Sequence, residues 1–134
     1  MGAELEARFR PPDHLRPAIR AISERLFAAG RRVARELGYN LVAHGSMERD
    51  CDLVAIPWTD DAVGEDTLVL ALQAAFGEAL GTECYLGHGW SLKPHGRKAN
   101  TLILLETGLV NEEAPGKGEG FPFVDLSVMP RARP

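Results

Sequence analysis

The change in hydrophobic period near residue 38 constrains the fold of this chain more than any other feature. Upstream of it, apolar residues recur at intervals of three and four, as on a helix with one buried face. These residues are Leu15, Ile19, Ile22, Leu26, Ala29, Val33 and Leu37. Downstream, residues 39–44 and 51–56 form two short β-rich runs joined by the turn-forming segment 45–50. The sequence therefore predicts a long helix packed on a sheet whose first two strands are neighbours.

The rest of the chain continues with helical and strand patterns. Residues 65–80 carry a second helical pattern that ends at Gly81, and residues 99–105 and 123–128 have the composition of strands. A further short strand is expected at 84–86. Together these patterns predict an α/β (α+β) domain of two layers, in which two main helices cover a mixed or antiparallel sheet of about four or five strands.

Chain length and the polar segments define the expected domain organisation. With 134 residues, the chain is expected to form a single domain, 1–134. Residues 1–12 end in two prolines and are expected to be a flexible lead-in. Residues 111–120 are polar and rich in glycine, so we expect a mobile loop there.

Composition excludes several classes of protein. Hydrophobic residues make up 45% of the chain and charged residues 25%, which is typical of a globular domain and not of a disordered one. Two cysteines provide no disulfide framework. No apolar stretch is long enough to span a membrane, and the first residues lack the apolar segment of a secretory signal. We therefore expect a cytoplasmic protein without a membrane partner.

The distribution of charge bears on possible partners. The chain has a net charge of −4, and residues 39–90 hold nine acidic residues and one basic residue. Five basic side chains of the first helix could meet a nucleic acid, but they are equally typical of a solvated helix face: Arg16, Arg20, Arg31, Arg32 and Arg35. A nucleic acid is therefore not the favoured partner, and the sequence carries no signal for an oligomeric state.

Three aspartates stand in segments that are otherwise apolar. Asp50 and Asp52 are two positions apart and, in a strand, point to the same face of the sheet. Asp125 lies between apolar neighbours in the last strand, where a buried carboxylate needs a partner. If the two strands are adjacent, the three carboxylates form a cluster suited to Mg²⁺ or Mn²⁺, because such ions prefer oxygen ligands. The alternative is a structural salt-bridge network in which Arg49 pairs with Asp50 or Asp125.

Gly45 and Ser46 precede these aspartates and extend the pattern. A strand ending in Gly-Ser, an Asp-x-Asp in the next strand and a hydrophobic-Asp-hydrophobic sequence in a later strand together resemble the nucleotidyltransferase (polymerase-β-like) superfamily. The resemblance implies a minimal nucleotidyltransferase-like fold in which Gly45 and Ser46 contact the phosphates of a nucleotide. It also implies that the three aspartates are catalytic and hold two Mg²⁺. Only residues 47–49 separate Gly-Ser from Asp50, whereas the family has a longer segment there, with a helical turn whose amides help hold phosphate.

Three longer motifs resemble a family of small proteins encoded by tailed phages and prophages. They are HGSMERDCDLVAIPW at 44–58, KPHGR at 93–97 and DLSVMP at 125–130. This resemblance spans most of the chain and implies no particular activity. For a phage-encoded protein it implies the host cytoplasm as the location.

The segment 93–98 places three cations and a histidine around a proline and a glycine. Lys93 and Arg97 could bind the phosphates of an anionic substrate. His95 is a candidate catalytic residue, because loops often carry function. The alternative is a solvated hairpin turn without a functional role.

Three ring side chains each have two interpretations. His44 alternates with Val42 along its strand and is expected to be buried and hydrogen-bonded, the alternative being a base near the carboxylates. Trp58 and Trp90 could stack on a nucleobase, but each is more typical of a core or a lid.

The favoured hypothesis is a small phage-type, nucleotidyltransferase-like protein whose divalent-metal carboxylate site acts on a nucleotide or another phosphorylated small molecule. As an enzyme, it would transfer a nucleotidyl group or hydrolyse a phosphate ester. One alternative is a non-catalytic protein that binds a nucleotide or a signal molecule, which the short spacing between Gly-Ser and Asp50 favours. The other is an acidic protein-interaction module that binds no such ligand.

Overall fold

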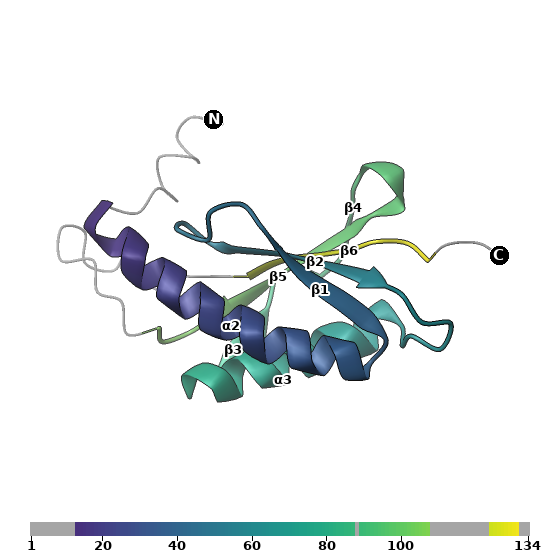
Figure 1. Cartoon of the computed structure of the whole chain (residues 1–134), viewed down its shortest axis with the longest axis horizontal. Coiled ribbons are helices and arrows are strands. Elements are labelled where there is room, and N and C mark those ends of the chain that lie inside the picture. The colour runs from purple at the N-terminus through teal and green to yellow at the C-terminus, as the bar shows by residue number, and fades with distance from the viewer. Residues whose placement is uncertain (1–12, 88, 108–123, 132–134) are drawn as a thin grey trace.

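Two helices lie on one face of a mixed sheet (Figure 1). The computed structural model describes residues 13–87, 89–107 and 124–131. The helices are α2 (Arg16–Glu36), which follows the short 3₁₀ helix η1 (Asp13–Leu15), and α3 (Glu65–Leu80). The strands are β1 (Tyr39–His44), β2 (Cys51–Pro57), β3 (Cys84–Leu86), β4 (Ser91–Leu92), β5 (Lys98–Leu104) and β6 (Val124–Val128), with the 3₁₀ helix η2 (Pro94–Gly96) between β4 and β5.

These elements confirm the predicted α+β architecture of two layers. The bounds of α3 and β1 are those predicted, and β2 extends one residue further, to Pro57. The sequence does not predict β4, a two-residue strand that brings the sheet to six strands. The predicted lead-in at 1–12 and the predicted loop at 111–120 lie outside the described residues.

Helix α2 buries Ile19 and Leu26 of the predicted apolar stripe, and its buried face also includes three small residues that the prediction does not name, Ser23, Gly30 and Ala34. Gly30 lies on this buried face, and a Cβ atom there would come within 2.7 Å of Cε1 of Phe76 on α3, so the two helices approach closely at this point. The helix ends before Gly38, which has a φ of +90° and whose Cβ would lie 2.7 Å from Cα of Ala62. Only glycine fits that position. Neither α2 nor α3 has the length and apolar content of a membrane-spanning helix.

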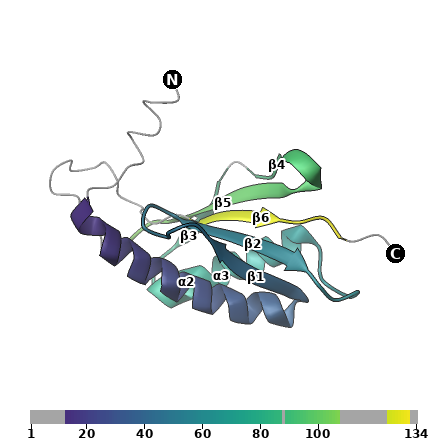
Figure 2. The same cartoon turned by 45° about the horizontal axis from the view of Figure 1, so that its top comes forward.

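The sheet has the strand order β1-β2-β6-β5-β3, with β4 paired to β5. Strands β2 and β6 are parallel, and the other pairs are antiparallel. Alternate residues of the central strands, among them Leu53, Leu126 and Leu102, are fully buried in the core with the helices. Both helices lie on the same side of the sheet, and the β4–β5 hairpin stands on the other side (Figure 2). The sheet therefore has a face covered by helices and, within the described residues, an open face.

Candidate functional site

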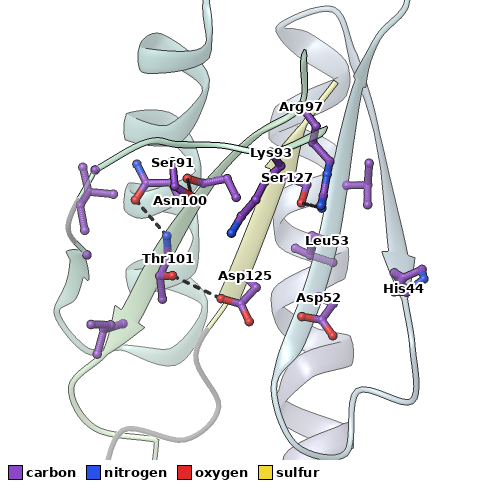
Figure 3. Close-up of a pocket in the computed structure, with 16 residues that line it drawn as sticks. His44, Asp52, Leu53, Ser91, Lys93, Arg97, Asn100, Thr101, Asp125 and Ser127 are labelled. Atoms are coloured by element: carbon purple, nitrogen blue, oxygen red, sulfur yellow. Dashed lines mark hydrogen bonds between the residues drawn. The ribbon is translucent and has the colours of Figure 1, made fainter. Parts of the chain in front are cut away.

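A row of polar side chains crosses the open face of the sheet. The strand register places His44 opposite Asp52, Asp52 opposite Asp125, and Asp125 opposite Thr101. Directly opposed residues of neighbouring strands share a face, so this row runs over four strands, β1, β2, β6 and β5. Figure 3 shows the carboxylates of Asp52 and Asp125 side by side on adjacent strands. The prediction that the last strand lies beside the strand of Asp52 is confirmed.

Three carboxylates converge at this row. One carboxylate oxygen each from Asp50, Asp52 and Asp125 lies within 4.8 Å of the other two, and all three residues are partly buried. Asp50 immediately precedes β2 and Asp52 lies within it. The spacing of two residues thus places both carboxylates on the side of Asp125, as the sequence predicts.

Burial and repulsion from neighbouring carboxylates disfavour ionisation of Asp50 and Asp125. Burial, followed by the charges of Asp52 and Asp125, raises the pKa of Asp50 from its ordinary value of 3.8 to about 7. Burial and the Asp52 charge also raise the pKa of Asp125, although the hydrogen bond from Thr101 acts in the opposite direction. A cation that binds among the three carboxylates at neutral pH would therefore reduce their mutual repulsion and stabilise their charged forms.

The described residues supply no ion-pair partner for the cluster. Their four ion pairs join other side chains: Arg16 with Asp13 and with Glu48, Arg20 with Glu24, and Lys98 with Glu65. Arg49 is exposed and lowers the pKa of Asp50 only as a lesser effect, after the opposing effects of burial and the two aspartates. The described residues therefore do not form the alternative salt-bridge network, in which Arg49 would pair with Asp50 or Asp125.

A pocket of about 1050 Å³ lies over the row, with cationic side chains at one end. Lys93 and Arg97 line it from the β4–β5 hairpin, while Asp52 and Asp125 line it from the sheet. Nη1 of Arg97 donates a hydrogen bond to Oγ of Ser127, over 2.8 Å. The pocket thus presents carboxylates at one end and two cations at the other (Figure 3).

Hydroxyl groups on the same face support the charged side chains. Oγ1 of Thr101 donates to Oδ1 of Asp125 over 3.3 Å, and Ser127 accepts the bond from Arg97. The site predictions from sequence omit Thr101 and Ser127. Their signal was present in the alternation of the two strands, because Ser127 lies two positions after Asp125 and therefore on the same face.

Gly45 and Ser46 occupy different environments. Gly45 has a φ of +79°, and a Cβ there would lie 3.6 Å from Oδ2 of Asp52, so its backbone lies beside the carboxylates. Ser46 is exposed, and its Oγ accepts a hydrogen bond from the backbone N–H of Glu48 over 3.3 Å. Ser46 is not among the described residues that line the pocket, and its predicted contact with phosphate stays a prediction.

His44 and His95 are both exposed, at different distances from the carboxylates. His95 sits in the turn η2 with a φ of +66°, is exposed, and is not among the described pocket-lining residues. His44 is exposed and lines the pocket, so the expectation that it is buried is wrong. The physical reason is that His44 ends an edge strand on the face that lacks a helix.

Neither tryptophan lines the pocket within the described residues. Trp58 has 61% of its surface exposed beyond the end of β2. Trp90 packs against the hydrophobic core and donates from Nε1 to Oδ1 of Asp66 over 2.6 Å. Trp90 therefore fits the interpretation of a core residue better than that of a nucleobase contact.

No protein-family model and no curated protein matches this chain.

Proposed function

We propose that this protein is a nucleotidyltransferase-like protein that binds a nucleotide, or another phosphorylated small molecule, together with Mg²⁺ or Mn²⁺ at Asp50, Asp52 and Asp125. One observation carries the proposal: three partly buried carboxylates converge with no ion-pair partner among the described residues, and two of them, Asp52 and Asp125, line a pocket that also holds two cationic side chains. Carboxylates and cations in one pocket suit a ligand that brings both a metal ion and phosphates.

The donor set fits a hard divalent cation. Each aspartate offers an oxygen, the ligand type that Mg²⁺ and Mn²⁺ prefer, and the three oxygens are close enough to share an ion. A bound divalent cation would offset the repulsion among the carboxylates and stabilise charge that develops on a phosphoryl group.

The remaining side chains of the pocket have roles that follow from their contacts. Thr101 orients the carboxylate of Asp125 through its hydroxyl. Lys93 and Arg97 would bind phosphate oxygens, and the bond to Ser127 restricts the orientation of the Arg97 guanidinium. A guanidinium held in place beforehand loses less conformational entropy when it binds an anion.

A non-catalytic binding protein is the second candidate, and the turn before β2 favours it. This turn, residues 45–50, contains no described helix whose N-terminal amides could hold a phosphate. The hydroxyl of Ser46 is engaged inside the turn. Binding through the cationic hairpin requires neither feature, whereas nucleotidyl transfer in the manner of the resembling superfamily uses both.

The first test is titration calorimetry with Mn²⁺. The wild-type protein is expected to bind Mn²⁺, and Asp52→Asn is expected to weaken binding by more than about tenfold while the protein stays folded. Asp61→Asn is the matched control, because Asp61 is exposed and lies outside the pocket. If the wild-type protein does not bind Mn²⁺, or if both variants behave alike, the metal site is contradicted.

The second test separates an enzyme from a binding protein. The wild-type protein is incubated with each nucleoside triphosphate and Mg²⁺ or Mn²⁺, products are separated by chromatography, and equilibrium binding is measured in parallel. A product that is lost in Asp52→Asn supports an enzyme. Binding without product supports the binding protein. The absence of both contradicts the proposal and leaves the protein-interaction module.

A further inference from the structure

Lys93 and Arg97 form the cationic wall of the pocket, and they belong to the β4–β5 hairpin, which has few backbone contacts within itself. Strand β4 has only two residues, and it pairs with the start of β5 through Ser91 opposite Ala99 and Leu92 opposite Lys98. Within the turn, the N–H of Lys93 donates to the carbonyl of Arg97 over 2.7 Å. From Lys98 onward β5 pairs with β6 in the sheet, but β4 has no partner other than β5 among the described strands, and a ribbon of two strands is marginally stable in water. The positions of Lys93 and Arg97 therefore depend on contacts outside the hairpin.

Two side chains tie the hairpin to helix α3. Nε1 of Trp90 donates to Oδ1 of Asp66 over 2.6 Å, and Nζ of Lys98 contacts Oε1 of Glu65 at 2.5 Å. Trp90 directly precedes β4 and Lys98 is the first residue of β5. Each strand of the hairpin therefore has one side-chain contact, or anchor, to α3. Both acceptors are in the first turn of α3, where carboxylates also interact favourably with the helix dipole.

The two anchors reinforce each other. A partly exposed ion pair such as Lys98–Glu65 contributes little by itself. Trp90, in contrast, packs its ring against the hydrophobic core while its N–H reaches Asp66. The hydrogen bond to Lys98 lowers the pKa of Glu65, so the pair stays charged over the neutral range. Together they attach the hairpin to a helix that is itself part of the core.

We propose that Trp90 and Lys98 are positioning residues that hold Lys93 and Arg97 over the carboxylates, so that the pocket binds phosphate groups with an ordered cationic wall. This inference rests on the proposed function. Neither residue lines the pocket within the described part of the chain, whereas Lys93 and Arg97 do. Their effect on a ligand is therefore exerted through the hairpin and leaves the carboxylate cluster unchanged.

The variants for the test remove one anchor at a time. Trp90→Phe deletes the indole N–H but keeps an aromatic ring against the core, and Lys98→Met deletes the charge but keeps a long side chain. Lys98→Arg should restore the ion pair with Glu65 and serves as the rescue variant. Trp58→Phe is the matched control, because Trp58 is exposed and lies outside the pocket.

Two measurements report on the hairpin and on the ligand separately. Amide hydrogen exchange of Lys93 follows opening of the hairpin, since this amide donates to Arg97. Affinity for inorganic pyrophosphate and for ATP, each measured with Mn²⁺, reports how well Lys93 and Arg97 bind phosphate groups. We expect faster exchange at Lys93 in Trp90→Phe and Lys98→Met, and phosphate affinities lower by about 2- to 12-fold, the range of one hydrogen bond. Affinity for Mn²⁺ alone should not change.

Each contrary result has a distinct meaning. Unchanged exchange at Lys93 would contradict the anchoring, and faster exchange with unchanged phosphate affinity would contradict the positioning role while the proposed function stands. An equal loss of Mn²⁺ affinity would show that the variants disturb the whole site, which also overturns the inference. If the wild-type protein binds neither phosphate compound, the proposed function fails, and the positioning role fails with it.

Discussion

The two faces of the sheet differ in what the same strands present. On the helix-covered face, Leu53 of β2 and Leu126 of β6 are fully buried. One residue earlier on each strand, Asp52 and Asp125 point to the open face and line the pocket. Because the pleat alternates sides at every residue, one strand can contribute to the core and to a polar site at once. Substitutions one residue apart should therefore separate stability from binding.

The largest expected effect is on the covered face. Leu126→Ala removes a fully buried side chain and is expected to lower the free energy of unfolding by about 2–5 kcal/mol, measured by urea denaturation. Ile103→Ala is the control on the open face, where 41% of the Ile103 surface is exposed and about 0.5 kcal/mol is expected. If both variants lost the same stability, the open face would be as tightly packed as the covered one, and the comparison would fail.

The next effect concerns the cationic end of the open face. Arg97→Ala removes a charged donor and is expected to weaken binding of ATP with Mn²⁺ by about 1.5–3 kcal/mol, measured by equilibrium binding. The loss should shrink as salt is added, because salt screens the attraction between Arg97 and phosphate. The control is Arg32→Ala, on the exposed side of α2. An equal loss in this control would place the anion site elsewhere.

A smaller effect is expected on the pH dependence of stability. The raised pKa of Asp50, about 7 against an ordinary 3.8, means that the folded state holds this proton more tightly than the unfolded state. The resulting stability is present at low pH and is lost as the pH rises through about 7. Asp50→Asn should therefore be more stable than the wild-type protein at pH 8 by about 1–2 kcal/mol, after allowance for solvent screening of this half-buried group.

This difference is measured by urea unfolding in a chelator at pH 5 and pH 8. It should shrink toward pH 5, and added Mn²⁺ should stabilise the wild-type protein more than the variant, because a ligand that binds only the folded state stabilises that state. Asp61→Asn is the control, as Asp61 is exposed. A difference that does not vary with pH would contradict the raised pKa of Asp50.

Local patterns predicted much of the fold. The bounds of α3 follow from acidic residues in its first turn and from Gly81, which adopts the left-handed conformation at its end. The convergence of the aspartates follows from period-two alternation together with the cost of burying a carboxylate alone. The adjacency of β2 and β6 was predicted by this argument, although Pro57 at the end of β2 and Val124 at the start of β6 are 67 positions apart in the sequence.

What could not be predicted depends on contacts between distant segments. Strand β4 has too few residues for a pattern, and it exists because the start of β5 offers it a partner. The exposure of His44 depends on which face of the sheet the helices cover. The alternation of residues along a strand does not predict which face that is. The hydrogen bond from Arg97 to Ser127 joins residues 30 positions apart in the sequence, one just before β5 and the other in β6. No pattern of neighbouring residues predicts such a contact.

The smallest expected effect tests the hydroxyl that supports the carboxylate row. Thr101→Val keeps the shape of the side chain but removes the bond to Asp125, which lowers the pKa of that carboxyl. The pKa of Asp125 should therefore rise further, and protons should compete better with the metal. Affinity for Mn²⁺ is expected to fall at pH 6 by about 0.5–1.5 kcal/mol, and by less at pH 8, in titration calorimetry. Ser91→Ala, a change at a pocket-lining hydroxyl on β4, should leave Mn²⁺ affinity unchanged at both pH values. An equal loss for Thr101→Val at pH 6 and pH 8 would mean that the hydroxyl fixes the geometry of Asp125 and does not act through its proton.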